Sequence, residues 1–277
     1  MSVSIFIQTL NEEANLPGLL DSVAWADDIV VLDSLSTDET ESIARDRGCR
    51  FFKREYDGRG THQNWAMENI DFKYPWVFYL DADERMTDEL KDEILTIASN
   101  LEEKRVAFYC GRRNYFQNTW LKHAMPPGHI MRFFKPPTIR FKRKANPVPI
   151  IDGEVGYLTS HFLHYNFSKG LREWIERHNR YSTYEAEETM RALREQPVRW
   201  GNLFSLDGAT RRIEIKNLSF RLPFRPTLRF IYMYLLKGGF LDGRAGLTYC
   251  KLLKMYEWQI VLKVRELKRE AKEMPKG

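Results

Sequence analysis

The chain contains little cysteine, and this scarcity argues against two classes of protein. Three cysteines in 277 residues are too few and too scattered for a disulfide framework, and none stands at a metal-ligand spacing. We therefore expect a protein of a reducing compartment that has no zinc site. Its hydrophobic content of 43% is enough for one large core, or for a core and a smaller helical region.

Long apolar runs are also lacking. The apolar segments of the C-terminal quarter, such as 228–236, are interrupted by charged residues before they reach the roughly 20 residues that span a bilayer. Residues 3–7 (VSIFI) read as a strand and lack the basic region and cleavage site of a signal peptide. The expected location is the cytoplasm.

Positive charge is unevenly distributed. Residues 211–277 hold 16 Lys and Arg against 6 Asp and Glu, whereas residues 1–210 hold 27 against 32. A basic C-terminal quarter on an acidic body suggests contact with phospholipid, phosphorylated glycan or nucleic acid. Because the sequence has no nucleic-acid recognition motif, we do not expect nucleic acid as the partner.

Strands and helices alternate over the first hundred residues. Apolar runs predict the strands, and apolar residues at helical spacing predict the helices between them. The expected order is strand 3–9, helix 12–23, strand 29–32, helix 37–47, strand 50–52, helix 61–70 and strand 76–80. This alternation predicts an α/β fold with a parallel sheet, whose ligands lie at the carboxyl ends of the strands.

Polar residues stand at three of these strand ends. Asn11 follows the first strand, Asp33 the second, and Asp81-Ala82-Asp83-Glu84 the fourth. Two carboxylates one residue apart can hold a divalent cation and the diphosphate that it neutralises, although many strands end in acids that only face solvent.

Together these motifs resemble those of the family 2 glycosyltransferases, which have the GT-A fold. The matching segments are 9–13 (TLNEE), 31–38 (VLDSLSTD) and 80–84 (LDADE). The resemblance implies a Rossmann-like, mostly parallel catalytic domain over residues 1–167, with a nucleotide-sugar half over about 1–100 and an acceptor half over about 101–167. Residues 168–277 would form a helical, basic region. Members of the family transfer a sugar with inversion from a nucleotide-diphosphate donor, usually with Mn²⁺ or Mg²⁺.

The resemblance also implies roles for individual residues. Asp81, Asp83 and His164 would bind the metal ion. The residues expected to bind the nucleotide-sugar are Thr9, Asn11, Glu12, Asp33, Ser34, Arg59, Gln63, Asn64, Asp81 and Ala82. Two assignments have simple alternatives, because Arg59 between two glycines also fits an ordinary solvated turn and His164 also fits a packed core residue.

The segment 146–158 (NPVPIIDGEVGYL) resembles one branch, the lipopolysaccharide-core glucosyltransferases of the WaaE type. That branch has His-Glu after Pro-Val and places the acid as general base, whereas this chain has Pro149-Ile150 there. Inverting transfer still needs a group that takes the proton of the acceptor hydroxyl, and a carboxylate is the usual solution. The predicted base is Asp152, with Glu154 second and Asp83 and Glu84 as outside alternatives.

The last hundred residues are expected to be helical. Ser168 should cap a helix from Gly170 to about Arg194. Beyond it, aromatic and leucine residues alternate with Lys and Arg, which suits helices lying in a membrane interface. Helices packed on the catalytic domain or on a second subunit would look the same. The segment 240–247 (FLDGRAGL) again resembles the WaaE-type branch, which supports an acceptor anchored in the cytoplasmic leaflet.

The combined prediction is an inverting, metal-dependent glycosyltransferase, peripheral on the inner face of the cytoplasmic membrane. It would use a UDP-sugar and extend lipopolysaccharide core or a polyprenyl-linked oligosaccharide, and its C-terminal helices allow a homo-oligomer. Transfer to polyprenyl phosphate itself is the nearest rival. A sugar-1-phosphate nucleotidyltransferase should have a glycine-rich phosphate loop after the first strand, which residues 9–13 lack. A non-catalytic lipid-surface adaptor would explain the basic tail but not the acids.

Overall fold

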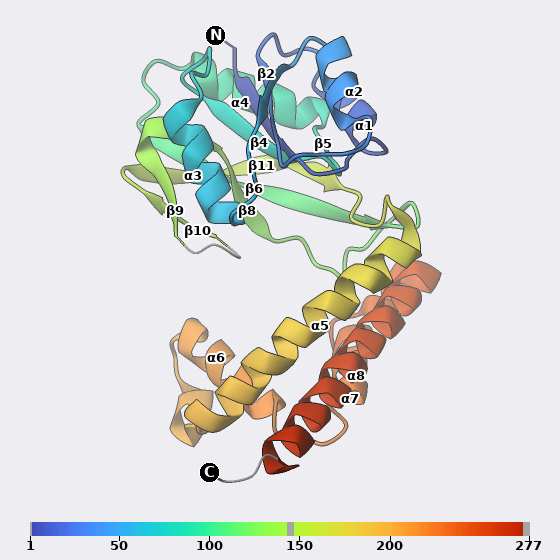
Figure 1. Cartoon of the computed structure of the whole chain (residues 1–277). Helices are drawn as coiled ribbons and strands as arrows, with labels where there is room; N and C mark the ends of the chain where they lie inside the picture. The colour runs from blue at the N-terminus through green and yellow to red at the C-terminus, as the bar shows by residue number, and fades with distance from the viewer. Residues whose placement is uncertain (1, 143–146, 274–277) are drawn as a thin grey trace. The chain divides into compact units, whose positions relative to one another are not determined.

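The computed structural model describes residues 2–142 and 147–273, which form two compact units (Figure 1). The sheet unit consists of Met1–Trp120 and Pro126–Ser168, and the helical unit of Leu121–Met125 and Lys169–Gly277. The short segment 121–125, which lies inside the expected catalytic domain, thus belongs to the helical unit.

A mixed sheet forms the centre of the sheet unit. Its strands are β1 (Ser4–Thr9), β2 (Ile29–Asp33), β3 (Arg50–Lys53), β4 (Val77–Asp81), β5 (Glu84–Arg85), β6 (Arg105–Phe116), β7 (Thr119–Trp120), β8 (His129–Phe134) and β11 (Glu154–His164). The order is β3-β2-β1-β4-β8-β6-β11-β5, and β7 pairs with β6. The first four strands of this order are parallel, β8 is antiparallel to β4 and β6, and β6 is parallel to β11. β9 (Ile139–Lys142) and β10 (Val148–Ile151) form a separate antiparallel pair.

Helices cover both faces of the sheet. They are α1 (Leu16–Ser22), α2 (Thr40–Asp46), α3 (Arg59–Asn69) and α4 (Asp88–Ser99). Successive side chains of a strand point to opposite faces. Ile5 and Ile7 of β1 therefore join one core cluster with Leu19 of α1, while Phe6 joins the other with Met67 of α3. The expected α/β fold is confirmed.

The helix starts differ from those expected. α1 begins at Leu16 rather than residue 12, with Pro17 in its first turn, where a missing backbone N–H costs no hydrogen bond. α3 begins earlier than expected, at Arg59, because the chain turns at Gly58, whose φ of 132° requires glycine. Arg59 is thus the first residue of a helix and not part of a loop.

The strand pairing brings the polar strand ends to one edge of the sheet. Thr9 lies opposite Asp33, and Gln8 lies opposite Asp81. β5, which follows β4 closely, pairs with the end of β11 at His164. The residues that follow β1, β2 and β4 therefore share one edge with the end of β11.

The helical unit contains four α-helices among the described residues, of which α5 and α8 are long. The four are α5 (Gly170–Glu195), α6 (Gly208–Ser219), α7 (Arg225–Ile231) and α8 (Gly243–Glu273), with the short turns η2 (Trp200–Phe204), η3 (Tyr232–Leu236) and η4 (Gly239–Asp242). α5 and α8 pack side by side through Ala186, Ile260 and Val264 (Figure 1). Ser168 is not the N-cap of α5, because the helix begins at Gly170 and its N-cap is Lys169, which makes no side-chain cap hydrogen bond. Over the described residues, every helix is too short or too polar to cross a bilayer.

Candidate active site

The turns that follow β1 and β2 are joined through Asp33. This fully buried carboxylate accepts hydrogen bonds from Thr9 Oγ1 (2.8 Å), Ser36 N (2.7 Å) and Ser36 Oγ (2.5 Å). The Ser34 hydroxyl lies 3.4 Å from Nε2 of His62. Asp33 thus fixes the shape of these turns, and its own oxygens are occupied by protein donors.

Asn11 joins the same pair of turns from the other strand. Its φ of 54° is in the left-handed region, which Asn adopts more readily than most residues. Its N–H donates to Ser36 Oγ (2.8 Å), and its Oδ1 accepts from Thr37 N (2.8 Å). The N–H of Glu12 donates to Thr40 Oγ1 (2.8 Å). Five predicted residues therefore occupy one place at the ends of β1 and β2, namely Thr9, Asn11, Glu12, Asp33 and Ser34.

Two arginines hold Asp81 at the end of β4. Nη2 of Arg59 and Nη2 of Arg132 each lie 2.8 Å from its Oδ2, and the Tyr79 hydroxyl donates to its Oδ1. Burial alone would raise the pKa of Asp81, but the positive charges of Arg132 and Arg59 outweigh burial and hold this pKa well below its usual range. Asp81 is therefore ionised in the folded protein at neutral pH.

Arg132 also binds Glu84, and this ion pair is fully buried. Nη2 of Arg132 lies 2.6 Å from Oε1 of Glu84, and the backbone N–H of Asp81 donates to Oε2 (2.9 Å). Burial raises the pKa of Glu84 to about 7, opposed by the attraction of Arg132 and assisted by repulsion from Asp81. One arginine thus couples two carboxylates whose pKa values move in opposite directions.

Asp83 and His164 face each other across the same edge. Oδ2 of Asp83 lies 3.4 Å from Nε2 of His164. On the other side of the imidazole, Nδ1 lies 2.9 Å from Oδ1 of Asn114, a buried residue of β6. Because an amide oxygen only accepts, the neutral ring carries its proton on Nδ1 and presents the lone pair of Nε2 to the Asp83 carboxylate.

This arrangement fits a divalent cation. A lone pair and a carboxylate oxygen repel unless a proton or a metal ion lies between them, and an amide oxygen on the far nitrogen is a usual orienting partner of a metal-bound imidazole. Asp81, the third predicted ligand, is held by arginines, and no group of three or more His, Cys, Asp or Glu in residues 2–142 and 147–273 is placed to hold a metal ion. The geometry offers two protein ligands, Asp83 and His164, so further ligands would have to come from a bound molecule.

Gln63 and Asn64 of α3, both predicted to bind the nucleotide-sugar, differ in the hydrogen bonds that their side chains make. Asn64 uses both side-chain groups on the backbone of Phe141 in β9, with Nδ2 donating to the carbonyl (2.9 Å) and Oδ1 accepting from the N–H (2.7 Å). Asn64 thus fastens β9 to α3 and keeps one N–H and one acceptor lone pair that these two bonds do not use. Gln63 is buried, and its Oε1 has no hydrogen-bond partner among the residues that the structure describes. Gln63 therefore retains a polar group for a ligand.

The two predicted bases lie at the opposite end of the sheet. Glu154 begins β11 and His164 ends it, and with the two irregularities of this strand allowed for they lie roughly 25–30 Å apart. Asp152 precedes Glu154 in the exposed turn after β10. The prediction is corrected accordingly: neither carboxylate reaches Asp83, because β11 must run its full length to return to the site. Asn146, the first residue of that segment, lies outside the described residues.

Three residues of the site were not predicted from the sequence, namely Tyr79, Asn114 and Arg132. Glu84 was considered only as an outside candidate for the base, and in the structure it is paired with Arg132. The signal for Arg132 was available, since a cation that directly precedes two phenylalanines in a strand is buried only if it is paired. Its partners lie far away in sequence, so the pattern alone does not identify them.

Known proteins resemble this chain in sequence. Residues 4–163 match the family model for glycosyl transferase family 2. The chain is 26% identical over 282 residues to the lipopolysaccharide core biosynthesis glycosyltransferase LpsC of Rhizobium meliloti (strain 1021), with 93% of each chain covered. It is 36% identical over 108 residues to an uncharacterized glycosyltransferase of Rickettsia bellii (strain RML369-C), covering 39% of this chain and 36% of that relative.

Solved structures show weaker likeness. S. aureus TarS (residues 1–349) has a TM-score of 0.43 at 13% identity, with 99% of this chain and 92% of that chain covered. Glucosyl-3-phosphoglycerate synthase from Mycobacterium tuberculosis, in complex with Mn²⁺, UDP and glucosyl-3-phosphoglycerate, has a TM-score of 0.34 at 22% identity, with 40% and 44% covered. At these scores the likeness carries no functional argument.

Proposed function

The chain belongs to glycosyl transferase family 2 and is a glycosyltransferase, and we propose that it transfers a sugar with inversion from a UDP-sugar to a membrane-anchored glycan. Lipopolysaccharide core is the proposed acceptor class, because the relative LpsC, which aligns over 93% of both chains, is named for lipopolysaccharide core biosynthesis. A polyprenyl-linked oligosaccharide presents the same kind of acceptor, a glycan on a lipid.

One observation carries the proposal, the pairing of Asp83 with an imidazole that Asn114 orients. Nε2 of His164 and Oδ2 of Asp83 are 3.4 Å apart and both are electron-pair donors when the ring is neutral. We propose that they hold Mn²⁺ or Mg²⁺, and that the donor diphosphate supplies further ligands. When bound, the cation neutralises the charge that develops on the leaving diphosphate.

The residues around this pair prepare the donor position. Arg59 and Arg132 keep Asp81 ionised and fix the direction of its carboxylate. Arg59 is partly exposed, so its guanidinium is also available to a diphosphate oxygen. The buried Ala82 separates the two aspartates, and we propose that its backbone lies beside the bound donor.

The nucleoside is proposed to bind at the turns after β1 and β2. Thr9, Asn11, Glu12 and Ser34 would surround it. Asp33 acts as a positioning residue, since its oxygens hold Thr9 and Ser36 in place. Oε1 of Gln63, which has no hydrogen-bond partner within residues 2–142 and 147–273, is a further acceptor on α3 that a ligand hydroxyl or amide could satisfy.

We propose that the helical unit attaches the enzyme to the inner face of the cytoplasmic membrane. Residues 211–277 carry 16 cations against 6 acids. Large apolar side chains are well exposed in the unit, among them Phe204 (86%), Phe224 (79%) and Leu236 (76%). This combination suits an interface of anionic lipids. Cosedimentation with anionic vesicles tests the proposed membrane attachment. Protein that stays in the supernatant would contradict it.

Donor turnover by the full chain tests the proposed reaction. UDP release from UDP-sugars would be measured with a truncated lipopolysaccharide or with polyprenyl phosphate as acceptor, in Mn²⁺ and in EDTA. We expect release that needs metal and the glycan acceptor. Asp83→Asn should abolish it, whereas Asp92→Asn, an exposed residue of α4, should not. Metal-independent turnover, or turnover unchanged in Asp83→Asn, would contradict the proposal. Preference for the lipid phosphate would identify the rival acceptor.

A further inference from the structure

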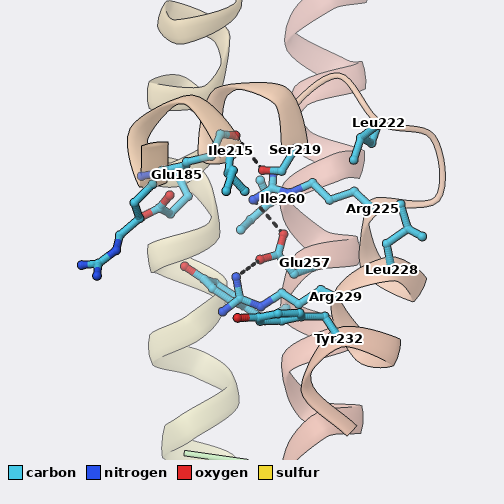
Figure 2. Close-up of a pocket in the computed structure, with 13 residues that line it drawn as sticks. Glu185, Ile215, Ser219, Leu222, Arg225, Leu228, Arg229, Tyr232, Glu257 and Ile260 are labelled. Carbon is cyan, nitrogen blue, oxygen red and sulfur yellow. Dashed lines mark hydrogen bonds and ion pairs between the residues drawn. The ribbon is translucent and has the colours of Figure 1, made fainter. Parts of the chain in front are cut away.

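The helical unit contains a cavity that the proposed transfer reaction does not use. It has a volume of about 600 Å³ and is lined by α5, α6, α7, η3, α8 and the segment between α6 and α7 (Figure 2). Cavities of this size hold small molecules in many proteins. The lining combines four cations and two carboxylates with aliphatic and aromatic side chains, which indicates a ligand that is anionic at one end and apolar at the other.

α6 presents one face to this cavity. The lining residues Arg212, Ile215, Lys216 and Ser219 stand at positions i, i+3, i+4 and i+7. Residues at this spacing lie together along one side of a helix. The face therefore offers two cations, one aliphatic side chain and one hydroxyl group.

α7 and the turn that continues it present the same pattern from another side. Arg225, Leu228, Arg229 and Tyr232 also stand at i, i+3, i+4 and i+7 (Figure 2). The order of side-chain types is again a cation, an aliphatic residue, a cation and a hydroxyl group. Two separate helices thus direct the same set of side chains into one cavity, namely cations and hydroxyl groups that can bind an anion, and apolar groups.

Glu257 orients two of the cations that line the cavity, and the lining as a whole stays positively charged. This buried residue of α8 forms ion pairs with both arginines: its Oε2 lies 2.9 Å from Nη2 of Arg225 and its Oε1 lies 2.8 Å from Nη1 of Arg229 (Figure 2). One carboxylate therefore orients two guanidiniums. With Glu185 as the second acid, the four cations of the lining leave a net charge of +2. Oriented guanidiniums that carry surplus charge are well suited to a phosphate, since each can donate two parallel hydrogen bonds.

The apolar part of the lining remains open to solvent. Ile215, Leu222 and Leu228 are 42–53% exposed, although they lie next to the cations. A free phosphate would leave these aliphatic side chains in water, whereas a hydrocarbon chain attached to the phosphate would cover them.

We propose that this cavity binds an anionic phospholipid through its headgroup phosphate and the adjoining part of its acyl chains. The inference deepens the proposed function and rests on it for the membrane-anchored acceptor, since a bound lipid would hold the helical unit at the leaflet that carries the acceptor. It concerns binding by the helical unit, so it can be tested without sugar transfer.

The first test compares three probes on the full wild-type chain by titration calorimetry. They are dihexanoylphosphatidic acid below its micelle concentration, dihexanoylphosphatidylcholine with the same chains, and inorganic phosphate. We expect one phosphatidic acid per chain, bound about tenfold or more tightly than either other probe. Equal affinity for phosphatidylcholine would overturn the role of the cations, and equal affinity for inorganic phosphate would overturn the role of the acyl chain.

The second test locates the site with matched variants. Arg212→Gln/Lys216→Gln removes two exposed cations from the cavity, and Arg211→Gln/Lys251→Gln removes the same two charges outside it. We expect the first variant to bind phosphatidic acid about tenfold more weakly and the second to bind as wild type does. Equal binding by the two variants would overturn the assignment. Both variants should still bind UDP with Mn²⁺. If the wild-type chain itself does not bind UDP with Mn²⁺, that result counts against the proposed transfer reaction and not against the lipid site.

Discussion

Nη2 of Arg132 lies 2.6 Å from Oε1 of Glu84, and both side chains are buried in the sheet unit. The same guanidinium binds Asp81 at 2.8 Å and covers the ring of Tyr79 at 4.4 Å. Moving these charges out of water costs free energy, which pairing offsets only while every partner is present. The orientation of the acids at the end of β4 therefore depends on a residue of β8.

Arg132→Met should be strongly destabilising. The substitution leaves Glu84 buried without its cation, and we expect the free energy of unfolding of the sheet unit to fall by about 3–5 kcal/mol. Urea unfolding followed by tryptophan fluorescence measures this loss. Arg45→Met is the control, because the pair of Arg45 with Glu41 is largely exposed and should contribute little. Similar losses in both variants would mean that the buried pair is no more important than a surface pair.

Glu84 should make stability depend on pH. Its pKa is about 7 in the folded chain against an ordinary value of 4.5, so the folded state keeps a proton that the unfolded state loses between these values. The stability from this group is complete below about pH 4.5 and is lost as the pH rises towards 7. The side chain of Glu84→Gln stays uncharged at every pH. The Tm of this variant minus the Tm of wild type should therefore increase as the pH rises from about 4.5 to about 7. Thermal unfolding at several pH values checks this, and a constant difference in Tm would refute it.

The sequence was sufficient to predict the polar residues at the strand ends, but not the ion pair of Arg132 with Glu84 that connects β8 to β5. Asn11, Asp33 and Asp81 each stand at or just after the end of an apolar strand, so local pattern and the geometry of parallel sheets predicted that they share one edge of the sheet. The pairing of Arg132 with Glu84 depends on how β8 inserts between β4 and β6. Nothing near either residue in the sequence encodes that register.

The misplaced base has a similar cause. Asp152 is the acid nearest in sequence to the position where the resembling branch has His-Glu, but the turn between β10 and β11 carries it away from the site.

The segment 240–247 was interpreted through its resemblance alone. In the structure, Asp242 in this segment accepts hydrogen bonds from residues 122–124, and Gly246 packs so closely on Gly239 that a Cβ would lie 2.2 Å from its carbonyl oxygen. Both contacts join residues that the sequence pattern treats as separate.

Asn114 should control the metal affinity of the site as a positioning residue. Asn114→Ala removes the acceptor that keeps the proton of His164 on Nδ1, and we expect the affinity for Mn²⁺ in the presence of UDP to fall by about 10–100-fold. Asn114→Asp retains an acceptor at this position and should restore most of the affinity. Titration calorimetry measures both variants. Unchanged affinity in Asn114→Ala would show that the imidazole does not ligate the metal.

Asp242 should hold the segment 121–125 in the helical unit. Its carboxylate accepts from the backbone N–H groups of Lys122 (3.1 Å), His123 (2.9 Å) and Ala124 (2.7 Å). Asp242→Ala leaves these donors without their acceptor, and we expect the unit to lose about 2–3 kcal/mol of stability. Hydrogen exchange measures the effect directly, because the amides of residues 122–124 should lose protection first. Asp242→Asn keeps one acceptor oxygen and should show a smaller loss. Unchanged protection in Asp242→Ala would contradict the assigned role.

Asp152→Asn and Glu154→Gln should leave turnover nearly unchanged. Both side chains are exposed and lie at the end of β11 that is roughly 25–30 Å from His164, so neither can take a proton from an acceptor bound at Asp83. Removing a true general base lowers kcat/KM by about 10²–10⁴-fold. Steady-state kinetics of the two variants therefore separate the alternatives clearly, and Asp83→Asn in the same assay supplies the expected loss. A large fall in kcat/KM for Asp152→Asn, with unfolding midpoints equal to wild type, would mean that the acceptor approaches from the other end of the sheet and that the site assigned to the carboxyl edge is incomplete.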